Sequence, residues 1–151
     1  SHNSSLIGDC SSDKPTNLVP VITEVAIGKR KEIKVFGNDY NTIDGTCIRD
    51  YIHVLDLAKS HVKAMNFLIT KPGKYAYNVG TGNGVSVLDA IKTFEKTNKL
   101  IINYSIGPRR SGDIEQIYAN SNLIKEELSW QAKESLEEAM KSAWAWEKQK
   151  N

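Results

Sequence analysis

The pattern of hydrophobic and polar residues predicts helices and strands in turn along most of the chain. After a polar loop over residues 1–14, hydrophobic side chains recur every three or four positions over residues 18–25. This spacing predicts a helix that starts near Asn17 and ends at Gly28. Hydrophobic and charged residues then alternate over residues 32–37, as they do in a strand.

The segment over residues 49–57, with the sequence RDYIHVLDL, organises the middle of the chain. A polar, glycine-containing loop over residues 37–46 precedes it. Residues 51–54 predict a short β-like run, and Asp56 is placed to cap a helix over residues 57–68. The hydrophobic side chains of that helix fall on one stripe, made of Ala58, Val62, Met65 and Leu68.

The second half of the chain continues this alternation. Residues 75–79 predict a strand, and the glycine-rich sequence GTGNG follows at residues 80–84. The further predicted elements are a helix capped by Ser86 and Asp89, a strand over residues 100–106, a polar loop over residues 106–118, a helix over residues 122–128, and a helix over residues 136–148 capped by Ser135 and Glu138. Strands separated by helices predict a small α/β domain with short, largely parallel strands and several helices.

The composition is that of an ordinary globular protein of one domain. Of the 151 residues, 40% are hydrophobic and 25% are charged, and the net charge of +2 is too small to indicate a nucleic acid or a membrane surface as a partner. No hydrophobic run approaches the roughly 20 residues that a membrane span needs. Cys10 and Cys47 lack the spacing of metal ligands, so we predict reduced thiols in a cytoplasmic protein.

The GTGNG stretch lies between a predicted strand and a predicted helix, where the phosphate-binding loop of a dinucleotide site would lie. Its spacing, G-x-G-x-G, lacks the final interval of the G-x-G-x-x-G fingerprint. No acidic residue follows a second strand about 20 residues later. We therefore predict a tight turn here and not a nucleotide site.

Two arginines are better candidates for binding an anion. Arg49 stands at the entry of the predicted run over residues 51–54, and Arg110 lies with Asp113 in the RRSGD sequence of the late loop. Two guanidinium groups could clamp a diphosphate through paired hydrogen bonds, while Asp113 accepts hydrogen bonds from ribose hydroxyls. A solvated surface pair is the alternative, because sequence spacing alone does not bring the two segments together.

Three further residues have two interpretations each. Asn17 is either a plain helix cap or an amide that binds a base or a sugar hydroxyl. Phe36 is either a core residue or one face of a stacking slot for a ring. His53 lies in a hydrophobic run with no partner at catalytic spacing, so we favour a buried, hydrogen-bonded histidine over a general base. The charged residues indicate neither a catalytic triad nor a metal site.

Several stretches follow one another in order almost from end to end: TNLVP, VAIGKR, VFGNDYNTIDGTCIRDYIHVLDLAKSHVKAM, YNVGTGNGVSVLDAI, PRRSGD and WAWEKQ. Together they resemble the C-terminal part of the UDP-glucose 4-epimerase family, which belongs to the extended short-chain dehydrogenase/reductase superfamily. The resemblance implies an enzyme of galactose and nucleotide-sugar metabolism. Such an enzyme interconverts UDP-galactose and UDP-glucose by NAD-dependent oxidation and re-reduction at C4.

The resemblance also implies roles for individual residues. Those assigned to the substrate are Asn17 and Leu18 for general contact, Lys34, Val35 and Phe36 for the uracil end, Arg49 and Arg110 for the diphosphate, Asp113 for the ribose, and Tyr51 as a further lining residue of the same cleft. Ile117 stands where the family carries a residue that limits the size of the hexose. That residue is often Tyr in bacterial members and small in members that accept N-acetylated sugars. Ile is intermediate in size, so activity on UDP-N-acetylglucosamine stays open.

The family's NAD fingerprint and catalytic Tyr-x-x-x-Lys pair lie before the position that matches Ser1. We therefore expect residues 1–151 to be a UDP-sugar-binding portion without catalytic residues, inactive alone, from a protein whose NAD-binding Rossmann domain is mostly absent here. The lack of an initiator Met agrees with a piece of a longer protein. The family implies a cytoplasmic homodimer. Two alternatives are a stand-alone UDP-binding module and another NAD-dependent UDP-sugar enzyme, such as a decarboxylase or dehydratase.

Overall fold

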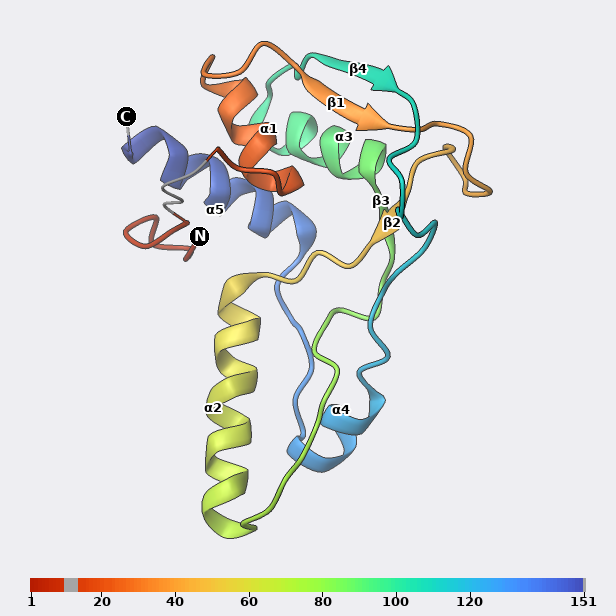
Figure 1. Ribbon diagram of the computed structural model, residues 1–151. Coiled ribbons are helices and arrows are strands. Elements are labelled where there is room, and N and C mark those ends of the chain that lie inside the picture. Colours follow the sequence, from red (N-terminus) through yellow and green to blue (C-terminus); the bar gives the residue numbers. More distant parts are fainter. Residues whose placement is uncertain (10–13, 151) are drawn as a thin grey trace.

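The computed structural model describes residues 1–9 and 14–150, so the prediction for Cys10 lies outside the described residues. The elements, in chain order, are α1 (Leu18–Ala26), β1 (Ile33–Phe36), β2 (Ile48–Arg49), α2 (Val54–Thr70), β3 (Val85–Ser86), α3 (Val87–Asn98), β4 (Tyr104–Gly107), α4 (Asn122–Leu128) and α5 (Leu136–Gln149). Helices α1, α3 and α5 lie with β1 and β4 at one end of the molecule, and α2 and α4 extend toward the other end (Figure 1). The predicted α/β class with short strands and several helices is confirmed.

Both strand pairs join segments that are far apart in the sequence. β1 pairs in parallel with β4 along its whole length, so that Phe36 lies opposite Gly107. β2 pairs antiparallel with β3, and Gln116 adds an isolated parallel bridge to Ile48. The end of β1, the strand β2 and the segment after β4 are thereby held near one another.

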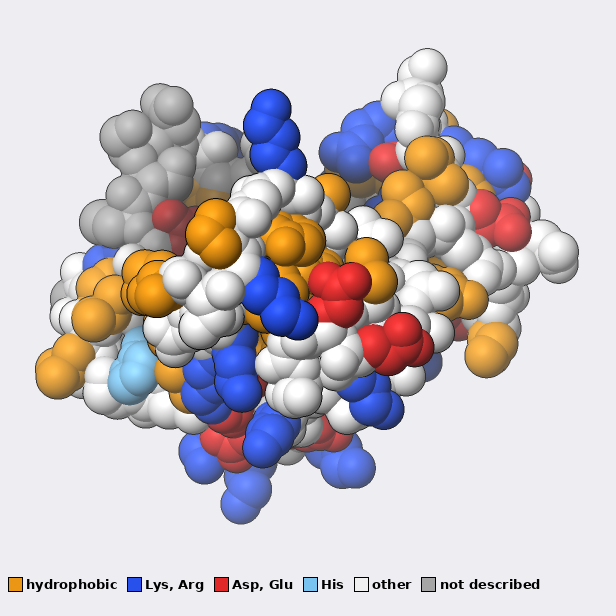
Figure 2. Space-filling model, turned by 90° about the horizontal axis from the view of Figure 1, so that it is seen from below, with side chains coloured by type: hydrophobic (Ala, Val, Ile, Leu, Met, Phe, Trp, Pro, Cys, Tyr) orange, Lys and Arg blue, Asp and Glu red, His pale blue; other side chains and the backbone are white. Residues whose placement is uncertain are grey.

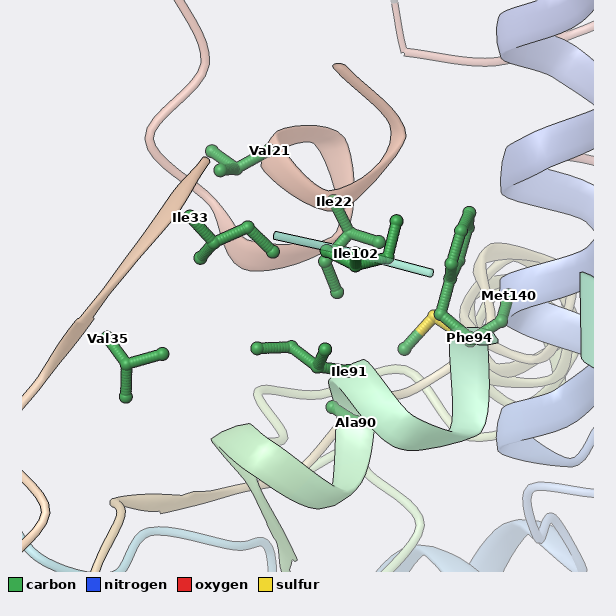
Figure 3. Packing of buried hydrophobic residues seen from close by; sticks show 9 residues of the cluster. All are labelled: Val21, Ile22, Ile33, Val35, Ala90, Ile91, Phe94, Ile102 and Met140. Atoms are coloured by element: carbon green, nitrogen blue, oxygen red, sulfur yellow. The ribbon is translucent and has the colours of Figure 1, made fainter. Parts of the chain in front are cut away.

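The main core lies between β1 and the helices α1, α3 and α5. Its buried side chains point toward one another from these elements (Figure 3): Val21, Ile22, Ile33, Val35, Ala90, Ile91, Phe94, Ile102 and Met140. Phe94 also meets the ring of Trp144 on α5 edge-on, with the ring centroids 6.1 Å apart. Burial of each large hydrophobic side chain contributes about 1.5–3 kcal/mol, so this cluster is the main source of stability for the end that carries β1 and β4.

Serine caps begin two of the core helices where the sequence predicts them. Ser86 Oγ accepts a hydrogen bond from the backbone N–H of Asp89 at 3.0 Å, and Ser135 Oγ accepts one from Glu138 at 3.2 Å. These bonds satisfy N–H groups that have no partner inside the helix. The starts of α3 and α5 were thus readable from local sequence.

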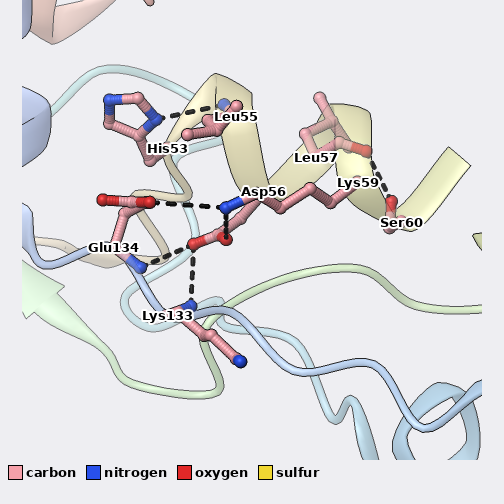
Figure 4. Close-up of polar contacts among 8 residues, drawn as sticks. All are labelled: His53, Leu55, Asp56, Leu57, Lys59, Ser60, Lys133 and Glu134. Carbon is pink, nitrogen blue, oxygen red and sulfur yellow. Dashed lines mark hydrogen bonds and ion pairs between the residues drawn. The ribbon is translucent and has the colours of Figure 1, made fainter. Parts of the chain in front are cut away.

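The start of α2 differs from the prediction. α2 begins at Val54, and the cap is His53, whose Nδ1 accepts a hydrogen bond from the backbone N–H of Leu55 at 3.0 Å. The β-like run predicted over residues 51–54 is absent, because β2 ends at Arg49 together with its two-residue partner β3. Asp56, predicted as the cap, lies in the first turn of α2 and points away from the helix toward the segment before α5 (Figure 4).

The predicted strand over residues 75–79 does not form within the described part of the chain. A strand needs a partner for its backbone, and no described strand pairs with this segment. Tyr77 and Val79 instead pack against a second hydrophobic cluster, formed by Ile124, Leu128 and Trp130 beside α4. The strand prediction for residues 75–79 is therefore wrong for the described chain, because a strand-like pattern alone does not supply a neighbouring strand.

α2 itself is confirmed as a helix, but its hydrophobic stripe faces outward. Val62, Met65 and Leu68 are 52%, 57% and 43% exposed, whereas the fully buried positions of the helix are Asp56 and Ser60. The inner face of α2 combines these two polar residues with Ala64 and Phe67, which are partly buried against the cluster beside α4. Figure 2 looks onto the far end of α2 and α4 and shows hydrophobic side chains at the surface among Lys and Arg.

Candidate functional site

An open cleft of about 1470 Å³ runs between α1, the end of β1, and the segment that joins β2 to α2. The residues predicted to contact a substrate that line it are Asn17, Leu18, Lys34, Val35, Phe36, Arg49, Tyr51, Arg110 and Asp113. They come from four separate stretches of the sequence, which the two strand pairs and the core bring together. Ile117 is the predicted site residue that does not line this cleft.

Arg49 and Arg110 approach the same carboxylate, that of Asp113. Arg110 Nη2 donates to Asp113 Oδ1 at 2.8 Å, and Arg49 Nη2 lies 3.6 Å from the same oxygen. The hydrogen bond to Asp113 raises the pKa of Arg110, so this guanidinium stays charged. The structure thus joins the two arginines that sequence spacing could not connect.

Arg49 is held more firmly than Arg110. Its Nη1 donates to the backbone carbonyl oxygens of Ile48 at 2.8 Å and Ile114 at 2.7 Å. The side chain of Arg49 is 28% exposed, whereas that of Arg110 is 60% exposed. Arg49 is therefore fixed in place by the backbone, and Arg110 is the arginine that is free to adjust to an anion in the cleft.

The last three residues of β1 point their side chains alternately into the core and outward. Successive side chains of a strand point to opposite faces, so Val35 is buried in the core while Lys34 and Phe36 face outward. The ring of Phe36 is 38% exposed and lies 5.4 Å from the guanidinium carbon of Arg110. The core interpretation of Phe36 is wrong, and Val35 lines the cleft although it is only 2% exposed.

Asn17 occupies the N-cap position of α1, but its side chain makes no capping hydrogen bond. Asn17 is therefore a cap by its backbone position alone, and its exposed amide is available to contact a ligand. Leu18, the first residue of α1, packs against the edge of the main core while lining the cleft. The start of α1 thus contributes one polar and one hydrophobic group to the same wall.

Tyr51, which is partly buried, and His53, which is buried, both line the cleft. Burial raises the pKa of Tyr51 to about 12, so its hydroxyl keeps its proton at neutral pH. Burial also lowers the pKa of His53, whose Nε2 lies 3.1 Å from Ser142 Oγ. With Nδ1 at the start of α2, both ring nitrogens have partners. The prediction of a buried, hydrogen-bonded histidine is confirmed.

Ile117 lies in the segment after Asp113, which runs beside β2. Its backbone N–H donates to the carbonyl oxygen of Ile48 at 3.0 Å, and its side chain is 49% exposed. The structure therefore places Ile117 beside the strand that carries Arg49, but outside the cleft itself.

The GTGNG loop is closed to a phosphate by a carboxylate of the chain itself. Thr81 N–H and Gly82 N–H donate to the two oxygens of Asp50 at 3.0 and 3.2 Å, and Ala119 N–H donates to Asp50 Oδ2 at 3.1 Å. A Cβ at Gly80 would lie 2.3 Å from Asp50 Oδ2, so glycine is needed for this approach. The backbone amides that a phosphate would use are already occupied, as the predicted tight turn requires.

Sequence reasoning missed one cluster beside the cleft, formed by Arg109, Asp39 and Tyr40. Arg109 and Asp39 are 70 residues apart in the chain and pair through a hydrogen bond of 2.7 Å. No local pattern predicts such a pair, because both residues lie in loops that carry many polar side chains. The parallel pairing of β1 with β4 is the feature that brings these loops together.

Within residues 1–9 and 14–150, no group of three or more His, Cys, Asp or Glu side chains is arranged to hold a metal ion. In the same part of the chain, none of the helices has the length and hydrophobicity to cross a membrane. Cys47 is buried as a free thiol.

The fold agrees with comparisons to known proteins. The chain belongs to the family described as GDP-mannose 4,6 dehydratase, whose model matches residues 8–143. Within that family it is similar to UDP-glucose 4-epimerases. It is 49% identical over 147 residues to the UDP-glucose 4-epimerase of Haemophilus influenzae, a match that covers 97% of this chain and 44% of the relative.

Two solved epimerase structures match the fold closely. The UDP-glucose 4-epimerase of Stenotrophomonas maltophila, bound to NAD and formylated UDP-arabinopyranose, superposes with a TM-score of 0.96 at 43% identity over 99% of this chain and 44% of that one. The enzyme of Bifidobacterium longum, in complex with NAD⁺ and UDP, gives a TM-score of 0.92 at 44% identity over 98% and 44%. The chain therefore spans less than half the length of these relatives and matches their C-terminal part.

Proposed function

We propose that this chain is the UDP-sugar-binding part of an epimerase that interconverts UDP-galactose and UDP-glucose by NAD-dependent oxidation and re-reduction at C4. One observation carries the proposal. Arg49, Arg110, Asp113 and Phe36 meet in a single cleft, in a chain that is 43–49% identical to UDP-glucose 4-epimerases. A diphosphate, a ribose and a pyrimidine ring are the groups that this combination of side chains suits.

The cleft favours binding through an exchange of anions. Arg49 and Arg110 now share the carboxylate of Asp113, which occupies the place of an anionic ligand. When UDP binds, the diphosphate oxygens accept hydrogen bonds from the two guanidinium groups, and Asp113 turns to the ribose hydroxyls. Phe36 offers its exposed ring to the uracil, with Lys34 and the backbone of Val35 beside it. Asn17 and Leu18 contact the substrate from α1.

The described residues do not fit a site for NAD. The GTGNG amides donate to Asp50, and the 151 residues contain no Tyr four positions before a Lys. We therefore place the NAD site and the catalytic Tyr and Lys in a preceding part of the same protein, and the role of this chain is to bind and orient the nucleotide. We also propose that the longer protein is a cytoplasmic homodimer and that Ile117 influences which hexose it accepts.

The outward face of α2 supports a preceding domain. Val62, Met65 and Leu68 form a hydrophobic stripe on the exposed face of α2, where polar side chains are usual. The unpaired segment over residues 75–79 lies in the same half of the molecule (Figure 1). A domain that covers this face and pairs with this segment would account for both features.

A second candidate is a stand-alone UDP-binding module without catalysis. It is favoured by the observation that the clamp residues all lie within these 151 residues. Joining this chain to the preceding part of the Haemophilus influenzae epimerase separates the two candidates. Turnover of UDP-galactose by the joined protein, but not by this chain alone with added NAD, supports the epimerase, and binding without turnover in both supports the module.

The nucleotide clamp is tested by calorimetric titration of UDP into this chain and its Arg49→Ala variant. Loss of one charge-assisted hydrogen-bonding partner should cost about 1.5–3 kcal/mol, which is about ten- to a hundredfold in affinity. Lys141→Ala removes an exposed charge on α5 and serves as the matched control. UDP affinity that does not change in Arg49→Ala, with an unaltered circular dichroism spectrum, would contradict the proposed clamp.

A further inference from the structure

β1 and β4 end side by side at Phe36 and Gly107, and a loop leaves each of them. The side chain of Arg109 crosses from the second loop to the first. Its Nε donates to Asp39 Oδ1 at 2.7 Å and its Nη2 donates to the backbone carbonyl of the same residue. The guanidinium carbon also lies 4.0 Å from the centroid of the Tyr40 ring. We call these three residues, Arg109, Asp39 and Tyr40, the loop clasp.

The loop clasp rests on a fixed base. Tyr40 is only 6% exposed, and its ring supports the guanidinium from below in a cation–π contact. Gly37 leaves the space that this contact needs, since a Cβ there would lie 2.8 Å from both Arg109 Cγ and Tyr40 Cε2. The hydrogen bond between the charged partners lowers the pKa of Asp39 and raises that of Arg109, so both stay ionised near neutral pH.

Arg109 and Arg110 are neighbours with different partners. Arg109 contacts the loop after β1, while Arg110 contacts Phe36 and Asp113 in the cleft. Because the two residues share a peptide bond, the backbone that Arg109 anchors is the backbone from which Arg110 extends. Arg110 is 60% exposed and lacks the two backbone contacts that fix Arg49, so its position depends on this anchor.

We propose that Arg109 is a positioning residue that holds Arg110 where the diphosphate of a bound UDP needs it. The inference rests on the proposed function of the cleft. Arg109 does not itself contact the nucleotide, because its Nε and Nη2 are directed at Asp39. The loop clasp therefore acts on the diphosphate end of the ligand and not on the uracil end, which Phe36 holds from β1.

The test compares UDP with uridine, which lacks the diphosphate, in competition titrations with this chain. Arg109→Ala and Asp39→Ala should each weaken UDP binding about three- to tenfold. The double variant should bind UDP with about the same affinity as the more weakly binding of the two single variants. Uridine affinity should change less than about twofold. Tyr40→Phe keeps the ring beside the guanidinium and should bind UDP as tightly as the parent. Tyr40→Leu removes the ring and should bind UDP more weakly. A merely structural role would lower the affinities for UDP and uridine together.

Arg110→Ala separates failure of the loop clasp from failure of the cleft. Weaker UDP binding in Arg110→Ala but not in Arg109→Ala would overturn the positioning role and leave the proposed function standing. Weaker binding in Arg109→Ala with parent affinity in Asp39→Ala would mean that Arg109 touches the ligand directly, which also overturns the proposal. Parent affinity in Arg110→Ala would overturn the proposed function and the loop clasp with it.

Discussion

Asp56 gives the sharpest test of how the two ends of the molecule are joined. Its side chain is 1% exposed, and its Oδ2 accepts hydrogen bonds from the backbone N–H groups of Lys133 at 2.8 Å and Glu134 at 2.7 Å. These bonds fix the segment before α5 to the first turn of α2 (Figure 4). Asp56→Ala removes the shared acceptor and leaves two N–H groups without it.

The magnitude follows from the number and kind of these bonds. A hydrogen bond to a charged group contributes about 1.5–3 kcal/mol, so the loss of both should lower the free energy of unfolding by about 3–6 kcal/mol. For a chain of this size that is a fall of about 6–24 °C in melting temperature. Asp56→Asn should cost less, about 1–2 kcal/mol, because its single amide oxygen can take the place of Oδ2 and accept both bonds.

Urea denaturation followed by circular dichroism and tryptophan fluorescence measures both variants. Glu126→Gln, which neutralises an exposed carboxylate on α4, is the control and should stay within about 0.5 kcal/mol of the parent. The reasoning is refuted if Asp56→Ala loses less than about 1 kcal/mol. It is equally refuted if Asp56→Asn lowers the free energy of unfolding as much as Asp56→Ala does, because the hydrogen-bond acceptor at Oδ2 would then not be the cause.

Two further predictions concern His53 and the outward face of α2. Because burial lowers the pKa of His53 in the folded chain, the unfolded chain binds the proton more readily, so stability should be full above about pH 6.5 and should fall as the pH drops through the lowered value. Urea midpoints measured between pH 7.5 and pH 5 should show this fall, and His53→Asn, which keeps a capping acceptor, should reduce it. Met65→Glu adds a charge to an exposed hydrophobic stripe, so it should weaken self-association of this chain in sedimentation experiments while changing stability by less than about 0.5 kcal/mol. Unfolding of Met65→Glu would show that this side chain is buried.

Local chemistry determined which elements could be predicted from the sequence. Ser86 and Ser135 supply caps within three residues of the N–H groups that they satisfy, so the helices that follow them were readable. The segment over residues 75–79 has a strand-like pattern, but its pairing depends on a neighbour that the described residues do not provide. His53 displaced Asp56 as the cap of α2 because its ring nitrogen, a less common cap, reached the first free N–H group.

In the candidate site, too, local chemistry could be predicted from the sequence, whereas contacts between distant segments could not. Arg49, Arg110 and Asp113 could be chosen from their chemistry and from a family resemblance, but their meeting depends on the pairing of β1 with β4 and of β2 with β3. Sequence left the burial of Phe36 and the capping by Asn17 open, and the structure shows an exposed ring and no side-chain capping bond. The loop clasp could not be predicted from the sequence, since Arg109 and Asp39 are 70 residues apart.

The wide separation in sequence of the residues that line the cleft has a consequence for the stability of the whole chain. Asn17, Phe36, Arg49 and Arg110 converge only when the core and both strand pairs are complete, so an unfolded chain has no such cleft. A ligand that binds only the folded state stabilises it by mass action, by about 2.7 kcal/mol at a hundred times its dissociation constant. Under the proposed function, nucleotide supply and the lifetime of the folded protein are coupled, and a cell rich in UDP-sugar also preserves this chain.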